Sequence, residues 1–565
     1  MGHDKRVVIA FALSFGMLVL WRVFFVKEPA PPPKPSASPQ VSTTAGQPTT
    51  AVPTAVKPPV PVPLPVVAGS KAEEIVVESD LYRLTFSTQG AVLKSWVLKK
   101  YRDQKENPLD VVNGPACGKL GFPLNLSLAD EAIENKANNA VYVATPLGAS
   151  LRSPVKLEFT YSDGKVQVRK QFAFGGGYEV RAEVSVFDGQ RYLPVEVNWP
   201  GGFGDQSLPP AIVDSVIQAV YGSPQDLTTV PQSKVKEDRL IPAPLQLAGM
   251  EDRYFAGVFL PESPDQVFLR AGRREWNPPD WKEKEKPRPL VLTLGSAQSK
   301  PLAFRLFVAP KDLDALRSVK PPLDSLVDFG WFSFVAKPLF LGLRYIYERW
   351  VHNYGWAIVM LTVFINLAMF PLKLKSIRSA QEMQRIAPLV KSIQEKYKGY
   401  KFNDPRKQRM NQEIMKLYQE HHINPLGSCL PMLLQLPFLY GFYRVLDLSI
   451  ELRHAPWILW IKDLSQPDKF HLFGLPLPIL PTVMIITMYI LQKMTPIATA
   501  DPAQQRMMMI MPLVFGIMFY NFASGLVLYW LTGNIVGIAQ QAFINKVMPI
   551  PQTLPVPRKA AEAKE

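Results

Sequence analysis

Three polar side chains inside the long apolar runs of the C-terminal part of this sequence are its best candidates for chemistry. Thr362 and Asn366 are four residues apart, so on a helix they share one face. Gln435 lies in another apolar run, between two prolines. Inside a bilayer such side chains face protein or a water-filled cavity, not lipid. Two interpretations stay open: hydrogen bonds between helices, or a shared hydrated groove.

Covalent catalysis has little support in the sequence. All six histidines lie outside residues 66–330, which removes from that region the side chain most often used for proton transfer near neutral pH. The motifs G-x-x-x-x-G-K-[ST], G-x-G-x-x-G and G-x-S-x-G are missing, and Cys117 and Cys429 form no C-x-x-C pair. We therefore expect no enzyme activity, no catalytic residue, no cofactor and no metal site.

The positive charge of the chain is concentrated in one short stretch. Residues 66–330 hold 32 Lys and Arg against 33 Asp and Glu, whereas residues 373–420 hold 12 against 5. A basic block between apolar runs is typical of a loop on the cytoplasmic side of a membrane. Direct nucleic-acid binding is the competing interpretation of such charge, and a ribosome could also use this loop.

The N-terminal residues predict a membrane anchor and a linker. Residues 7–26 are mostly apolar and follow Lys5 and Arg6, and roughly 20 such residues cross a hydrocarbon core of ~30 Å. A cleaved signal peptide is the alternative, but the Glu28-Pro-Ala-Pro31 stretch is a poor cleavage site. We expect an uncleaved signal anchor over residues 1–28. Residues 29–66 are rich in proline and nearly uncharged, which predicts a disordered linker.

Alternating apolar and polar residues predict a β domain over residues 67–328. The alternation is clear at 81–86, 155–159, 166–172 and 178–186, and Gly and Asp separate these stretches. Many short alternating strands are typical of a large antiparallel β-sandwich. Because the domain contains no histidine, we expect it to be structural or a docking surface.

The remaining sequence predicts a helical membrane region. Residues 329–352 combine aromatic residues with Lys337, Arg344 and Arg349, as in an amphipathic helix that lies at the membrane interface. Residues 353–545 then hold five further apolar spans, at 355–372, 426–446, 475–492, 507–521 and 525–543. With the anchor they make six spans, which puts both termini, including the tail 546–565, on the cytoplasmic side.

A helical hairpin is predicted between the first two of these five spans, over residues 373–424. Apolar residues recur at helical spacing on both sides of a break at 399–405, and the outer face is polar and basic. A solvated hairpin of this kind is suited to contact a partner on the cytoplasmic side. The basic residues expected to make that contact are Lys391, Lys396, Lys398, Arg406, Lys407 and Arg409.

Several motifs in this region resemble those of the YidC family of bacterial membrane-protein insertases, relatives of the mitochondrial and chloroplast insertases. The most specific is N-P-L-G-S-C-L-P-M-L-L-Q-L-P-F at residues 424–438. Others occur in the family's order: M-F-P-L at 369–372, E-L-R-H-A-P at 451–456, W-I-K-D-L at 460–464, D-P-A-Q-Q at 501–505 and S-G-L-V-L-Y-W at 524–530. The anchor, linker and β domain match the long form found in Gram-negative bacteria.

The resemblance implies a polytopic α-helical protein of the inner membrane with six transmembrane helices, five of which form the insertase core. It adds a large periplasmic β-sandwich and a cytoplasmic helical hairpin. The implied function is that of an insertase and folding chaperone, which moves client segments into the membrane through a hydrophilic groove without nucleotide hydrolysis. The implied partners are nascent membrane proteins and the lipid bilayer, with the Sec translocon and the ribosome as further candidates and no small-molecule substrate. Tyr529 and Trp530 join Thr362, Asn366 and Gln435 as expected groove residues.

One residue departs from the family pattern. Counting back from Pro371-Leu372, the family's characteristic groove arginine falls on Asn366, so we expect a groove that is polar but lacks a cation there. Arg444 is the nearest other intramembrane cation that the sequence offers.

Two other functions are weighed against the insertase. A secondary transporter would show repeated halves and a midplane ion site, and a membrane-anchored periplasmic carbohydrate-active protein would explain the β domain. The sequence shows no internal repeat, which argues against a transporter. The β domain contains no histidine, which argues against a carbohydrate-active protein.

Overall fold

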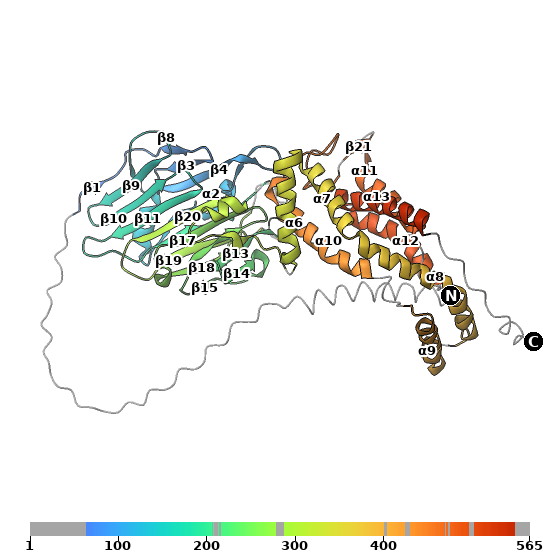
Figure 1. Cartoon of the computed structure of the whole chain (residues 1–565). Coiled ribbons are helices and arrows are strands. Elements are labelled where there is room, and N and C mark those ends of the chain that lie inside the picture. Colours follow the sequence, from blue (N-terminus) through green and yellow to red (C-terminus); the bar gives the residue numbers. More distant parts are fainter. Residues whose placement is uncertain are drawn as a thin grey trace, which may run out of the picture. The chain divides into compact units, whose positions relative to one another are not determined.

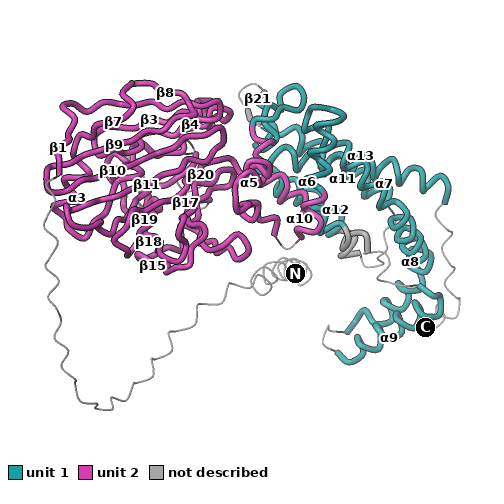
Figure 2. The backbone as a smooth tube through the Cα atoms, turned by 60° about the vertical axis from the view of Figure 1, so that its left-hand side comes forward, with its two compact units in different colours: residues 1–57, 339–440, 454–565 teal, residues 58–338, 441–453 magenta. Residues whose placement is uncertain are grey.

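The computed structural model describes residues 64–548 apart from 206, 208–212, 214–215, 278–286, 331, 401–403, 424–429, 469, 473–474 and 496–501. The predicted anchor over 1–28, nearly all of the linker over 29–66 and nearly all of the tail over 546–565 lie outside the described residues. The chain divides into two compact units (Figure 2). We call the unit of residues 58–338 and 441–453 the β unit, and the unit of residues 1–57, 339–440 and 454–565 the helical unit.

The strands predicted from alternation are present in the β unit. They are β3 (Tyr82–Ser87), β9 (Val155–Asp163), β10 (Gln167–Phe174) and β11 (Glu179–Phe187). Every second residue of β10 and β11 is buried, as expected for strands with one face on a core. β9, β10 and β11 pair with one another in antiparallel register and lie side by side in Figure 1.

These three strands belong to the largest sheet of the β unit, which has ten strands. Its order is β1 (Val66–Val67), β9, β10, β11, β20 (Leu302–Pro310), β17 (Phe255–Pro261), β16 (Leu247–Glu251), β13 (Gln218–Gly222) and β14 (Leu227–Pro231). The tenth strand, β7 (Val143–Thr145), pairs with β9 off this path.

Two smaller sheets complete the β unit. One runs in the order β15 (Arg239–Ile241), β18 (Val267–Arg273), β19 (Leu290–Ser296), β12 (Glu196–Trp199) and β6 (Leu126–Ser127). The other runs in the order β5 (Pro108–Asp110), β4 (Val92–Arg102), β3, β2 (Glu74–Glu78) and β8 (Ser150–Arg152). The pair β2–β8 is parallel, so the expectation of a purely antiparallel arrangement is wrong at this edge.

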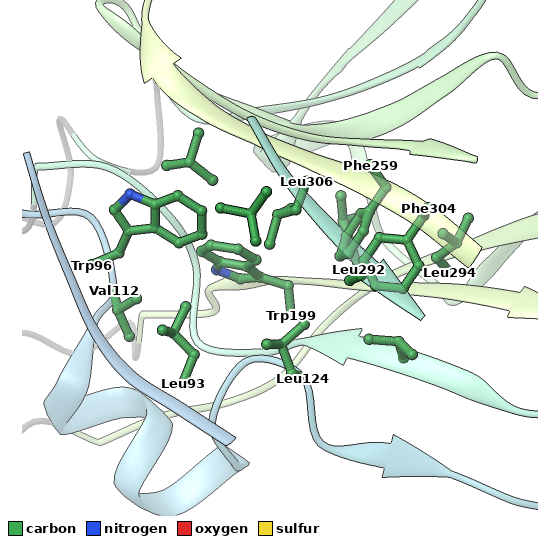
Figure 3. Packing of buried hydrophobic residues seen from close by; sticks show 14 of the residues in the cluster. Leu93, Trp96, Val112, Leu124, Trp199, Phe259, Leu292, Leu294, Phe304 and Leu306 are labelled. Atoms are coloured by element: carbon green, nitrogen blue, oxygen red, sulfur yellow. The ribbon is translucent and has the colours of Figure 1, made fainter. Parts of the chain in front are cut away.

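The sheets of the β unit enclose one large hydrophobic core with an aromatic centre (Figure 3). The ring centroids of Trp96 and Trp199 are 6.5 Å apart, and those of Phe259 and Phe304 are 5.3 Å apart. Because tightly packed aromatic rings contribute large buried areas, this cluster is a main source of stability for the unit. It joins residues that lie far apart along the chain.

One inward position of β10 carries a charged side chain, Lys170, which is completely buried. Its Nζ donates to the backbone carbonyl oxygens of Gly90 (2.8 Å), Ala91 (3.2 Å) and Leu124 (2.7 Å). Three carbonyls match the three N–H groups of an ammonium. Burial lowers the pKa of Lys170 to about 7.

The β unit also contains short helices, some between its strands and some after its last strand, β20. They are α2 (Gly114–Leu120), α3 (Glu131–Asn139), α5 (Leu313–Arg317) and the 3₁₀ turns η1 (Gln232–Lys234), η2 (Pro264–Gln266), η3 (Asp324–Leu326) and η5 (Ile450–Leu452).

The C-terminal part of the chain is helical between the segments that the structure leaves out. Its elements are α6 (Ser333–Ile346), the π-helical turn η4 (Tyr347–Val351), α7 (Tyr354–Ala368), α8 (Phe370–Lys396), α9 (Pro405–Glu420), α10 (Leu430–Leu448), α11 (Ile479–Met494), α12 (Pro502–Phe519) and α13 (Ser524–Val547), with a small hairpin of β21 (His471–Leu472) and β22 (Leu475–Pro476). α13 packs against both α7 and α11 (Figure 1). Side-chain caps begin two of the helices: Asn353 accepts from the backbone N–H of Trp356, and Asp404 accepts from that of Arg406.

Each of the five predicted spans contains a helix, but several boundaries differ from the prediction. The span predicted over 355–372 ends at Ala368, because α8 begins at Phe370 with Pro371 in its first turn and continues without a break to Lys396. Among the described residues one helix, α13, is by itself long and apolar enough to cross a membrane, and α6 with α7 would add a second if that bent pair is one span. The count of six spans stays a prediction.

Candidate functional site

The two polar residues predicted to share a face of α7 are both buried. Thr362 is 0% exposed and Asn366 is 5% exposed. The Thr362 hydroxyl donates to the Ile358 carbonyl oxygen (2.6 Å), and the Asn366 Nδ2 donates to the Thr362 carbonyl oxygen (2.8 Å). Both donors therefore satisfy carbonyls of their own helix, which leaves the Asn366 side-chain oxygen to accept from elsewhere.

That oxygen accepts from a lysine. The Nζ of Lys373 donates to Asn366 Oδ1 at 2.7 Å. Lys373 lies in the first turn of α8, seven residues after Asn366, which is close to two full helical turns. Met369, between the two helices, keeps right-handed helical backbone angles (φ −81°, ψ −7°), so the two residues stay on one face.

Gln540 of α13 forms hydrogen bonds with both Lys373 and Asn366. Its Oε1 accepts from Lys373 Nζ at 3.2 Å, and its Nε2 donates to the backbone carbonyl oxygen of Asn366 at 3.0 Å. We call Asn366, Lys373 and Gln540 the amide–lysine network. It brings together α7, α8 and α13, and residues that are up to 174 positions apart.

The network holds a positive charge without a carboxylate. No ion pair of Lys373 is found in the part of the chain that the structure describes, and the sequences of α7, α11, α12 and α13 contain no Asp or Glu. The oxygens that accept from Lys373 belong to neutral amides. A partly buried cation that is solvated only by neutral dipoles is more favourable once an anion approaches.

Gln435 and Tyr529 form a second polar contact. Gln435 Nε2 donates to the Tyr529 hydroxyl at 2.7 Å, and Tyr529 is 2% exposed. Tyr529, Gly533 and Gln540 follow one another at helical spacing along one face of α13. A Cβ at Gly533 would lie 4.0 Å from Asn366 Nδ2, so this face, which we call the α13 stripe, passes both polar groups.

Trp530 lies apart from these polar contacts. Its ring centroid is 5.4 Å from that of Phe515 and 5.1 Å from that of Phe519, both on α12. The structure therefore brings four of the five predicted groove residues to polar contacts on or beside the α13 stripe, and places Trp530 in an aromatic cluster.

Position 366 itself carries no charge, but the Lys373 ammonium lies beside it, which was not predicted from the sequence. Sequence reasoning assigned Lys373 to the hairpin and missed Gln540, although the spacing of seven residues from Asn366 to Lys373 could have been noticed. Arg444, the nearest other cation that the sequence offered, belongs to the β unit, where its guanidinium donates to the Asp328 carbonyl and lies 3.7 Å from the Asp447 carboxylate.

The helices α8 and α9 pair through an apolar seam, as the predicted hairpin requires. The seam is made by Met383, Ile386, Leu389, Val390, Ile414, Leu417, Tyr418 and Ile423. Of the six basic residues predicted to contact a partner, Lys391, Lys396, Lys398, Arg406 and Arg409 are exposed and Lys407 is half-buried. Lys396 is paired with Glu413 (3.2 Å) and Arg406 with Asp404 (3.1 Å).

Two family models match this chain over most of its length. The model described as 60Kd inner membrane protein matches residues 346–552, and the model described as YidC periplasmic domain matches residues 74–341. A protein of Pelobacter propionicus named membrane protein insertase YidC is 36% identical over 563 residues, which cover 96% of this chain and 99% of that protein. The chain belongs to the YidC family of membrane protein insertases.

The chain is also similar to a further relative and to two solved structures. The YidC insertase of Syntrophus aciditrophicus is 32% identical over 571 residues, which cover 96% of this chain and 99% of the relative. A crystal structure of an active YidC insertase aligns with 85% of this chain at 18% identity and a TM-score of 0.33. A galactose mutarotase-like protein from Lactobacillus casei aligns with 42% of this chain at 11% identity and a TM-score of 0.29.

Family membership decides between the functions that the sequence left open. The YidC relatives are named as insertases, so neither a transporter nor a carbohydrate-active protein is favoured. It also implies a location in the inner membrane and a periplasmic β-rich domain followed by a helical C-terminal region.

Proposed function

We propose that this chain moves transmembrane segments of newly made client proteins into the inner membrane and assists their folding, with the helical unit as its insertase core and without nucleotide hydrolysis. The observation that carries the proposal is the amide–lysine network, a group of hydrogen-bonding side chains among apolar helices. Polar groups at such positions stabilise a polar client segment that would otherwise lose its hydration in the membrane.

The client's own apolar helix supplies the driving force. Moving apolar surface from water into hydrocarbon is favourable by roughly 25 cal/mol per Å². The polar segment that precedes the helix opposes insertion, and the groups along the α13 stripe lower that barrier. Thr362, Asn366, Gln435, Tyr529 and Trp530 form the proposed substrate groove, and Lys373 and Gln540 are added to it.

The proposed topology has six spans, with both termini in the cytoplasm and the β unit in the periplasm. The net charge of +7 that residues 373–420 carry supports a cytoplasmic position for the hairpin. The family model named for a periplasmic domain matches residues 74–341, in agreement with the proposed side of the β unit. We retain the proposed domain boundaries, with the linker at 29–66, the β domain at 67–328, the interfacial helix at 329–352 and the core at 353–545.

The proposed cytoplasmic contact surface is the basic face of the hairpin. Lys391, Lys398 and Arg409 are exposed, and basic side chains in solvent attract acidic surfaces such as ribosomal RNA. The ribosome and the Sec translocon are the proposed partners at this surface.

Reconstitution tests the proposed function directly. Lipid vesicles that contain the purified full chain should protect the translocated end of a small single-span client from added protease, and protein-free vesicles should not. Asn366→Leu should lower the protected fraction about tenfold, because it removes an acceptor from a partly buried ammonium. Ile517→Leu is the matched control, since Ile517 is 73% exposed on α12. Equal protection in protein-free vesicles would disprove the function.

A further inference from the structure

Among the described residues, the two hydrogen bonds of the Lys373 ammonium leave one of its N–H donors unused. An ammonium has three donors, and two of them are used by Asn366 Oδ1 at 2.7 Å and Gln540 Oε1 at 3.2 Å. The third has no partner among the residues that the structure describes. The two amide oxygens therefore hold the ammonium in place and leave one donor for a ligand.

The ligand that this arrangement lacks is an anion. The four helices α7, α11, α12 and α13 offer no carboxylate, and among the described residues no Asp or Glu is paired with Lys373. A half-buried lysine without a counter-ion is disfavoured in a membrane protein unless it binds a partner. A charge-assisted hydrogen bond to a carboxylate is shorter and about twice as strong as a neutral one.

We propose that Lys373 is the anion-binding residue of the helical unit, and that it pairs with an Asp or Glu carboxylate in the polar segment of an incoming client. The inference rests on the proposed insertase function. Asn366 and Gln540 are positioning residues, because they hold the ammonium and carry no charge. The positive charge that the sequence lacks at position 366 is thus supplied two helical turns later, at position 373.

This arrangement explains why position 366 holds an amide. A cation at 366 would add a second positive charge beside the Lys373 ammonium, and neighbouring like charges destabilise each other. One cation is needed at this place, and it can come from either position. Moving the positive charge from position 373 to position 366 by substitution is therefore a specific test.

The experiment uses the full chain in phosphatidylcholine vesicles and two versions of one small single-span client. One client has two Asp in its translocated segment and the other has two Asn at the same places. Lys373→Gln should lower protease protection of the Asp client about tenfold and leave the Asn client within about twofold of its level with the unchanged chain. Lys375→Gln, an exposed lysine two positions further along α8, should change neither client.

The double variant Asn366→Arg with Lys373→Gln should restore protease protection of the Asp client. Asn366→Arg alone should lower that protection. Several outcomes would overturn the proposal. If Lys373→Gln lowers protection of both clients equally, Lys373 has a structural role. If it lowers protection of neither client, Lys373 is not part of the site. A loss confined to vesicles that contain phosphatidylglycerol would assign the lysine to a lipid phosphate. If the unchanged chain protects neither client, the proposed function itself fails.

Discussion

Arg453 and Asp205 form an ion pair in which each side chain is only 3% exposed, although 248 residues separate them. Both belong to the β unit, because residues 441–453, at the end of α10 and beyond it, are part of that unit. The guanidinium also lies 5.6 Å from the ring centroid of Tyr254 and 5.8 Å from that of Phe255. The pair attaches a segment from the C-terminal half of the chain to the β unit.

Removing one partner of this pair is expected to destabilise the β unit. Asp205→Asn leaves a buried guanidinium without its counter-charge, which costs about 3–5 kcal/mol. Denaturant unfolding of the full chain in detergent, followed by intrinsic fluorescence, measures the loss. Asp80→Asn is the control, because Asp80 is 91% exposed in its pair with Arg152 and should change stability by less than about 1 kcal/mol. Equal, small effects of the two substitutions would contradict the assigned role of the buried pair.

Lys170 should make the stability of the β unit depend on pH. Its pKa is about 7 in the folded chain and about 10.4 when unfolded. Between these values the unfolded chain binds more protons, so stability rises with pH, by at most about 1.4 kcal/mol per pH unit. Denaturant unfolding at a series of pH values from near 7 to near 10 measures the slope. Lys170→Met should remove this contribution, and an identical slope in both proteins would contradict the prediction.

The exposed lysines and arginines of the hairpin should decide how strongly a partner binds. Neutralising Lys391, Lys398 and Arg409 with Gln should weaken ribosome binding about tenfold at low salt and less at high salt, because the attraction is electrostatic. Co-sedimentation with purified ribosomes at several ionic strengths measures the effect. The matched control neutralises Lys71, Lys236 and Lys300, which are exposed on the β unit. Equal loss in both triple variants would indicate a general charge effect and not a contact surface.

Gly355 allows α7 to approach the segment that holds Trp457. A Cβ at position 355 would lie 2.1 Å from Trp457 Cδ1, so Gly355→Ala forces the indole to move. We expect a loss of about 1–3 kcal/mol, as for overpacked cores. Thermal unfolding in detergent would report it as a lower midpoint. Gly399→Ala should be neutral, because a Cβ there meets no atom within 4 Å. A stable Gly355→Ala variant would show that the indole can adapt.

Much of the fold could be predicted from local sequence pattern. Alternation at 155–159, 166–172 and 178–186 predicted strands that the structure contains, because a strand with one buried face needs an apolar residue at every second position. Helical spacing predicted the pairing of α8 with α9 for a similar reason. The parallel pair β2–β8 was missed, since its partners lie far apart in the chain and local pattern does not encode which strands meet.

The sequence by itself determined the family, the polar residues Thr362, Asn366 and Gln435 inside apolar runs, and the missing arginine at position 366. Only the tertiary structure decided where the positive charge lies. In the sequence alone, Lys373 is one basic residue among many in a predicted loop. Gln540 is one amide near the end of a predicted helix. They become a site because α13 packs against α7, which brings Gln540 to the backbone of Asn366 across 174 residues. Packing between distant helices depends on the whole fold, so no local pattern contains it.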